Sequence, residues 1–153
     1  MKKQEFLRNI TIGLTDGLTI PFALAAGLSS IVQSSFTIAA TCIALAAAGA
    51  LTMGTGSYLE QKKSSTGNYF STALTIGISY IIGGMISAAP YLFIPVPLEA
   101  LKYSAIISLV LLFIAGYYES KVNDANGFIG GIRVMLTGAA AAAAAFYVAK
   151  LFV

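Results

Sequence analysis

Five long apolar stretches limit what this sequence can fold into. They lie near residues 10–32, 36–59, 70–93, 98–118 and 128–149. Each has about 20 residues or more, which at about 1.5 Å of rise per residue crosses a hydrocarbon core about 30 Å thick. Because a lipid-exposed backbone must satisfy its own hydrogen bonds, helices are the economical structure for such segments. We therefore predict an all-α, polytopic membrane protein with five transmembrane helices.

The composition agrees with a membrane protein. Only 10% of the residues are charged, 58% are hydrophobic, and the mean hydropathy is +0.84. A soluble domain carries about 25% charged residues. The links between the apolar stretches are too short to hold a soluble domain, so we take residues 1–153 as a single transmembrane domain.

Several functions are excluded by the residues that are missing. The chain has no histidine, which excludes His-ligated zinc, haem or iron sites and any Ser–His or Cys–His nucleophile. Its one cysteine, Cys42, cannot form an intramolecular disulfide. The nine Lys and Arg residues form no basic stripe, which argues against nucleic-acid binding. We predict that the protein is not an enzyme and has no resident cofactor.

The basic residues predict an orientation. If the N-terminus is cytoplasmic, that side carries Lys2, Lys3, Arg8, Lys62, Lys63, Lys121 and Arg133. The other side carries only Lys102 and Lys150. The positive-inside rule then places the N-terminus in the cytoplasm and the C-terminus outside, and we expect a prokaryotic cell membrane. The first apolar stretch is too long for a signal peptide, so we expect it to be retained.

An acidic residue interrupts the first apolar stretch. Asp16 lies about two turns inside it, and a carboxylate at the centre of a bilayer costs about 2.5–3.5 kcal/mol on insertion scales. Farther along is Pro21, whose missing N–H leaves the Gly17 carbonyl without its helical hydrogen bond. A carboxylate beside a free carbonyl at membrane depth is typical of a segment that lines a cavity.

The second stretch offers a partner for Asp16. With residues 34–35 as the turn of a helical hairpin, Met53 lies as far after the turn as Asp16 lies before it. We therefore expect both at one depth. By helical periodicity, one face of the first helix carries Asn9, Asp16, Ala23 and Gly27. One face of the second helix carries Ala46, Gly49, Met53, Ser57 and Glu60. We predict a cavity between these faces, with Glu60 at its mouth.

The donor atoms of Asp16 and Met53 favour a particular class of ion. Oxygen donors alone suit Mg²⁺ or Ca²⁺, whereas a thioether favours first-row transition metals. In a chain without histidine, we predict this pair as the metal ligands that prefer Fe²⁺ over Mg²⁺. Further cavity-lining or relay positions are Gly17, Pro21, Gly49, Ser57 and Glu60.

A homodimer would complete such a site. Two symmetry-related copies would bring two carboxylates and two thioethers together as four ligands. Small residues at four-residue spacing suit close helix packing, and the chain has two such pairs, Gly13/Gly17 and Gly127/Gly131. We therefore expect a homodimeric helical bundle.

The three most informative residues also have structural interpretations. Asp16 could pair with Arg8 or Arg133 inside the protein. Met53 could fill a packing gap, as methionine often does. Glu60 could be a solvated charge at a helix end, beside two lysines.

Two segments resemble a known family. Residues 16–30, DGLTIPFALAAGLSS, resemble the first-helix signature of the vacuolar iron transporter family. Residues 49–59, GALTMGTGSYL, resemble its second-helix signature. The other three stretches agree with the family in number and general character, including a last helix rich in Gly and Ala.

This resemblance implies a five-helix protomer that forms a homodimer. It implies export of Fe²⁺, and often Mn²⁺ or Co²⁺, from the cytosol in exchange for protons, with Asp16 and Met53 as the intramembrane ligands. Many family members insert a Glu- and Met-rich helical domain that gathers metal between the second and third helices. Here that position holds only residues 61–68, so we expect weaker metal capture, or capture by a partner protein.

We therefore predict a proton-coupled transporter whose substrates are Fe²⁺ or Mn²⁺. Two alternatives stay open. One is a small proton-coupled exporter of organic cations, which would favour aromatic walls near Asp16 rather than the Gly, Ala and Ser of the two faces. The other is a membrane scaffold without transport, in which Asp16 bonds a basic residue of another protein.

Overall fold

The computed structural model describes residues 3–64 and 68–153 and consists of helices joined by short links. Within these ranges the helices are α1 (Lys3–Ser29), α2 (Ser35–Ser64), α3 (Tyr69–Phe93), α4 (Pro97–Val122) and α5 (Gly127–Lys150). All five are long and apolar enough to cross a membrane. The prediction of an all-α protein with five membrane-spanning helices is therefore confirmed. Lys2 and residues 65–67, used above for orientation and for the short link, lie outside the described residues.

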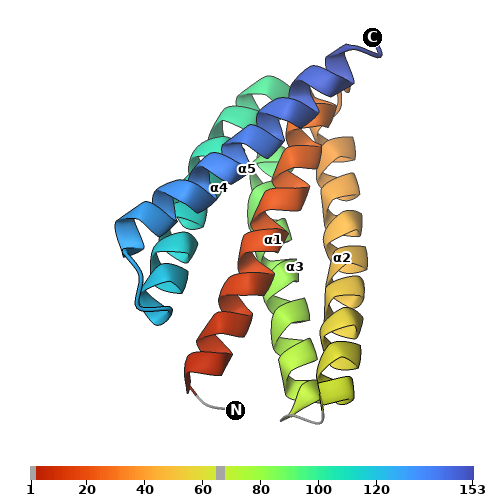
Figure 1. The fold of residues 1–153 in the computed structure, drawn as a ribbon. Coiled ribbons are helices and arrows are strands. Elements are labelled where there is room, and N and C mark those ends of the chain that lie inside the picture. The colour runs from red at the N-terminus through yellow and green to blue at the C-terminus, as the bar shows by residue number, and fades with distance from the viewer. Residues whose placement is uncertain (1–2, 65–67) are drawn as a thin grey trace.

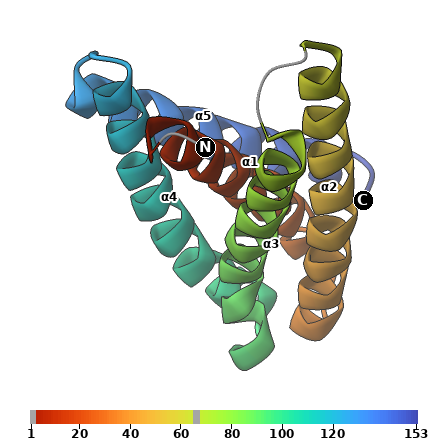
Figure 2. The same ribbon diagram turned by 90° about the horizontal axis from the view of Figure 1, so that it is seen from below.

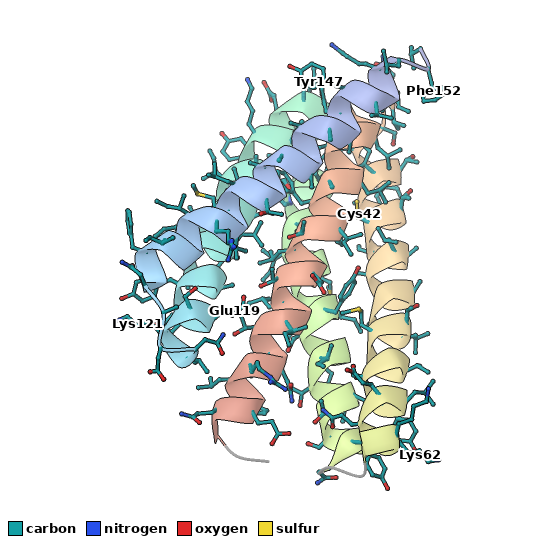
Figure 3. All side chains as sticks on the ribbon, viewed as in Figure 1. Cys42, Lys62, Glu119, Lys121, Tyr147 and Phe152 are labelled. Atoms are coloured by element: carbon teal, nitrogen blue, oxygen red, sulfur yellow. The ribbon has the colours of Figure 1, made fainter. Side chains whose placement is uncertain are left out.

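The chain runs back and forth along the bundle (Figure 1). The end of α2, the start of α3 and the link from α4 to α5 lie toward the end where α1 begins, which we call the N-terminal end of the bundle. The turns after α1 and α3 and the end of the chain lie at the opposite, C-terminal end. Figure 3 shows Lys62 and Lys121 toward the N-terminal end, and Tyr147 and Phe152 at the C-terminal end. The links must alternate between the two ends of the bundle, because each helix that crosses a membrane ends on the side opposite to the one where it begins.

The helix starts follow the sequence closely except in α1, whereas α2 and α4 end at Ser64 and Val122, beyond the predicted residues 59 and 118. Helices α2 to α5 each begin one residue before the predicted stretch, whereas α1 begins at Lys3 and ends at Ser29 instead of covering 10–32. Serine hydroxyls explain the early end, because such groups compete for helical carbonyls. The Ser29 Oγ donates to the Ala25 carbonyl and the Ser30 Oγ to the Gly27 carbonyl, each at 2.7 Å. Helix α1 continues through Pro21 without interruption.

Helix α1 contacts all four other helices, and α3 is packed against both α1 and α2 (Figure 2). Helices α4 and α5 form a second pair on the other side of α1. The hairpin of α1 and α2 predicted from the sequence is therefore not a simple face-to-face pair. Helix α3 packs against both α1 and α2, and these two helices contact each other less extensively.

Glycines bring α1 and α3 into close contact. A methyl group on Gly17 would overlap with the backbone of Tyr80, and one on Gly83 would lie 2.8 Å from the Leu14 carbonyl oxygen. A side-chain carbon cannot lie this close to backbone atoms of the neighbouring helix. Only glycine therefore fits at these two positions of the crossing. Small residues at membrane helix interfaces permit this backbone approach.

The two glycine pairs considered for dimer packing are used inside the protomer. Gly13 and Gly17 lie against the backbone of α3. Gly127 and Gly131 lie against aromatic rings of α4. A homodimer would therefore have to use other surfaces.

Buried serines connect α1, α3 and α4. The Ser87 Oγ donates to the Leu18 carbonyl at 3.1 Å, and the Ser104 Oγ donates to the Ser87 carbonyl at 2.7 Å. The Ser108 Oγ donates to the Ser87 Oγ at 3.3 Å. Hydrogen bonds between membrane helices contribute about 0.6–2 kcal/mol each, so this cluster fixes α1 relative to its neighbours.

Apolar side chains fill the C-terminal half of the bundle. Cys42 belongs to this core, as Figure 3 shows, and its Sγ donates to the Pro21 carbonyl at 3.4 Å. The core residues are Ala25, Ile38, Ala39, Cys42, Ala88, Tyr91 and Ala100.

Candidate functional site

A cavity of about 750 Å³ opens between α1, α2 and α3 in the N-terminal half of the bundle. Helix α1 contributes Glu5, Arg8, Asn9 and Ile12 to its wall. Helix α2 contributes Thr52, Met53, Gly56, Ser57, Glu60 and Gln61, and α3 contributes Ile76. The wall therefore combines carboxylates, hydroxyls, amides and one thioether, together with the guanidinium of Arg8. The oxygen and sulfur atoms can surround a hydrated cation.

The structure places part of the predicted site on this wall. Met53, Ser57 and Glu60 line the cavity along one face of α2, as does Asn9 on α1. Asn9 is buried and its Nδ2 donates to the Thr72 Oγ1 of α3 at 3.4 Å. The exposed Glu60 lies on the wall nearer than Met53 to the N-terminal end of the bundle.

Asp16 lies one helical turn beyond the cavity wall. Ile12 is the last wall residue of α1, and Asp16 follows it by four positions. Its side chain is partly exposed, and within the described residues it forms no ion pair with Arg8 or Arg133. The interpretation of Asp16 as one half of a fixed salt bridge with these arginines therefore finds no support.

Met53 lines the cavity of one protomer and Asp16 does not. Tyr80 of α3 lies against Gly49, one turn from Met53, and against Gly17, the residue after Asp16. A methyl group on Gly49 would overlap with the ring and hydroxyl of Tyr80, which is only 2% exposed. The sequence-based geometry omitted this ring because it considered only the first two helices.

Three residues that were predicted to line the cavity instead pack against other residues of the protein. Gly17 lies against the backbone of Tyr80, and Gly49 against its ring. Pro21 is buried, and its carbonyl accepts the hydrogen bond from Cys42. These residues shape the surroundings of Asp16 without lining the cavity.

The sequence analysis missed four polar residues of the wall, which are Glu5, Arg8, Thr52 and Gln61. Glu5 lies one turn before Asn9 on α1, and Gln61 lies one turn after Ser57 on α2. The Gln61 Oε1 is buried and has no hydrogen-bond partner among the described residues. Extending the predicted face of α1 by one turn toward the N-terminal end would have found Glu5, whereas Gln61 directly follows Glu60.

A single protomer offers few strong metal ligands. Within the described ranges, no group of three His, Cys, Asp or Glu side chains comes together. A transition metal ion bound by one carboxylate and one thioether would need further ligands. Water or a second copy of the chain would have to supply them.

Comparison with known proteins identifies the family. A family model described as the VIT family matches residues 7–68 and 60–150, which is most of the chain. The chain belongs to the VIT family. A relative from Eucalyptus grandis, named vacuolar iron transporter 1, is 32% identical over 95% of this chain and 86% of its own length. The Arabidopsis thaliana protein of the same name is 29% identical over 96% of this chain and 86% of its own length. Protein CCC1 of Saccharomyces cerevisiae is 27% identical over 95% of this chain and 68% of its own length.

This VIT-family chain is a short form. Its alignment with the Eucalyptus protein covers 215 positions, more than the 153 residues of this chain, so the relative has an internal segment that this chain lacks. The two matches to the VIT family meet at residues 60–68, which contain the link between α2 and α3. The short link noted in the sequence thus coincides with the point where the two matches meet.

Proposed function

We propose that this VIT-family protein transports Fe²⁺, with Mn²⁺ and Co²⁺ as further substrates, in exchange for protons. The observation that carries the proposal is the cavity in the membrane-spanning bundle, whose wall holds Met53 and Glu60 and which ends one turn from Asp16. The relatives named vacuolar iron transporter support the choice of metal.

The basic residues support entry of the ion from the cytoplasm. Lys62, Lys63 and Lys121 lie toward the N-terminal end of the bundle, where the cavity opens, and the positive-inside rule makes this the cytoplasmic side. The ion then passes Glu60 before it meets the Met53 thioether. A thioether on this route favours transition metals over Mg²⁺.

A second copy of the chain would complete the site. Asp16 is partly exposed on a helix that crosses the membrane, and a carboxylate that faces lipid is costly. A symmetric partner that covers this face of α1 would shield both copies of Asp16 and add ligands. We therefore propose a homodimer in which Asp16 and Met53 of both copies serve the transported ions.

Proton exchange follows from the chemistry of a carboxylate. Asp16 binds a metal ion only when ionised, so protons and metal ions compete for it. A proton taken up after the ion is released would keep the empty site neutral within the membrane. Acidifying the side from which the metal enters should therefore slow transport.

The test is metal uptake into vesicles that contain the purified protein. Asp16→Asn should abolish uptake of Fe²⁺ and Mn²⁺, because a neutral amide neither balances the ion's charge nor accepts a proton. Asp124→Asn is a matched control, since Asp124 is exposed in the link after α4 and asparagine tolerates its positive φ of 55°. Full uptake by the folded Asp16→Asn protein would contradict the proposed function.

The same vesicles separate the alternatives. An exporter of organic cations would take up a quaternary ammonium probe, and a scaffold would take up neither probe nor metal. The cavity wall carries no aromatic side chain among the described residues, which disfavours a site for organic cations.

A further inference from the structure

An apolar groove of about 470 Å³, which we call the α2–α3 groove, lies between α2 and α3. The two helix backbones approach each other closely along it, since a methyl group on Gly54 would lie 3.2 Å from the Ala73 carbonyl oxygen. A methyl group on Gly77 would lie 3.2 Å from the Ala50 carbonyl oxygen. The larger side chains that line the groove are apolar and exposed, and they include Leu51, Phe70, Leu74 and Ile78. A single hydrocarbon chain would contact protein on several sides there and gain more dispersion contacts than on a flat helix face.

This groove and the polar cavity lie on different sides of α2. Ala47, Leu51 and Thr55 line the groove at four-residue spacing, whereas Met53 and Glu60 line the cavity. Helical periodicity separates these two sets. Helix α1 contributes no residue to the groove. The proposed homodimer covers the face of α1 that carries Asp16, so it would leave the groove open to the lipid.

A lysine and two tyrosines lie at the N-terminal end of the groove. Tyr58 and Lys62 follow Leu51 by about two and three helical turns, so they continue the groove face of α2. The Lys62 Nζ lies 5.8 Å from the centroid of the Tyr58 ring, and this ring meets the Tyr69 ring of α3 edge-on at 5.4 Å between centroids. Within the described ranges Lys62 forms no ion pair. Figure 3 shows Lys62 toward the N-terminal end of the bundle.

The spacing along α2 suits a lipid molecule. Tyr58 and Lys62 lie about 5 and 10 Å beyond Thr55, the groove residue of α2 nearest this end. The headgroup layer on each side of a bilayer is about 5–8 Å thick. A chain in the groove therefore places its headgroup at the level of the Lys62 ammonium. Tyrosines are typical of this level of the membrane.

We infer that the α2–α3 groove binds an acyl chain of an anionic glycerophospholipid, whose headgroup phosphate pairs with Lys62. The groove supplies the apolar contacts, and the ammonium selects lipids with a net negative charge. This binding site goes beyond the proposed function and does not depend on it, because none of its residues lines the cavity.

The test uses a single fluorescent reporter. The chain contains no tryptophan, so Phe70→Trp on the groove wall gives the only tryptophan signal. The purified reporter protein is titrated in detergent with phosphatidylglycerol or phosphatidylcholine whose acyl chains carry bromine near the glycerol, which quenches tryptophan on contact. We expect an apparent Kd about fivefold lower for phosphatidylglycerol, which is the contribution of one lysine near an anionic headgroup.

Lys62→Gln tests the headgroup contact and should make the two apparent Kd values equal. Lys121→Gln is the matched control, because the Lys121 Nζ also lies 5.8 Å from a tyrosine ring centroid, that of Tyr117. That ring packs against Gly127 of α5, away from the groove. The control should therefore keep the preference for phosphatidylglycerol.

Ala47→Leu tests the chain contact. Ala47 is exposed and lines the groove, so a larger side chain there should raise the apparent Kd of both lipids severalfold. Ala48→Leu, at an exposed neighbouring position outside the groove, should leave both values unchanged. Lys62 is also exposed, so Lys62→Gln still tests the site if Ala47→Leu fails to fold.

Four results would overturn the inference. The first is equal binding of the two lipids by the reporter protein, and the second is an unchanged preference in Lys62→Gln or unchanged binding in folded Ala47→Leu. The third is displacement of the lipid by glycerol phosphate, which would show a site for phosphate alone. The fourth is quenching by neither lipid, with a dimer that Ala47→Leu dissociates, which would show that a second copy of the chain occupies the groove.

Discussion

At the scale of single residues, Asp16 is the group that most needs an explanation. It lies in the middle of a helix that crosses the membrane, and the described residues give it no ion pair with either candidate arginine. A carboxylate at such depth costs about 2.5–3.5 kcal/mol without compensation. A bound cation, a proton or a polar surface of a second copy can each offset this cost, and the proposed transport cycle uses all three.

Met53 is the residue on which metal preference depends. Met53→Leu is nearly volume-conserving, so the fold should tolerate it with a loss below about 1.5 kcal/mol. Without the thioether, the preference for Fe²⁺ over Mg²⁺ should fall by about tenfold or more, as for other changes near metal sites. Competition between the two ions in the vesicle assay measures this ratio, with Met85→Leu, an exposed methionine of α3, as the matched control. An unchanged ratio would remove the thioether from the mechanism.

At the scale of helices, the crossing of α1 and α3 holds Asp16 beside Tyr80. The contact depends on glycine on both sides, Gly17 on α1 and Gly83 on α3. The Ser87 hydrogen bond to the Leu18 carbonyl adds a polar connection at the same crossing. A displaced α1 would therefore change both the position of Asp16 and the end of the cavity.

Gly83→Ala should destabilise this crossing. A methyl group would lie 2.8 Å from backbone atoms of α1, which cannot move as a flexible side chain would. Overpacking costs about 1–3 kcal/mol, more than the gain of about 0.5–1 kcal/mol expected for Gly→Ala in a helix. We expect a melting temperature a few degrees below that of the parent in detergent.

Gly56→Ala is the control for this measurement. A methyl group on Gly56 of α2 would meet no atom within 4 Å, so only the helix-forming gain applies. Its melting temperature should equal or exceed that of the parent. A Gly83→Ala protein as stable as Gly56→Ala would show that the backbones can separate without cost.

At the scale of the whole molecule, the described residues of one protomer bring together no group of three strong metal ligands. The two glycine pairs Gly13/Gly17 and Gly127/Gly131 already pack against other helices of the same protomer. In the proposed homodimer, the partly exposed Asp16 lies on the face of α1 that the second copy would cover.

Metal binding should stabilise the intact protein. A ligand that binds only the folded state at 100 times its Kd stabilises it by about 2.7 kcal/mol. We therefore expect Fe²⁺, Mn²⁺ or Co²⁺ to raise the melting temperature of the purified protein, and Asp16→Asn to remove the effect. Thermal unfolding in detergent with and without each metal is the measurement. No shift with any of the three metals would favour the organic-cation or scaffold alternative.

The sequence alone determined the number of helices, most of their boundaries and the polar face of α2 that carries Met53, Ser57 and Glu60. Hydropathy and helical periodicity are local properties, so they can be read from a single chain. Only the tertiary structure decided that α3 packs against both α1 and α2 and that the Tyr80 ring lies against Gly49. The reason is physical: these contacts join residues far apart in the sequence, and they depend on where two backbones can approach each other. A hydropathy pattern does not show how closely two helix backbones can approach each other.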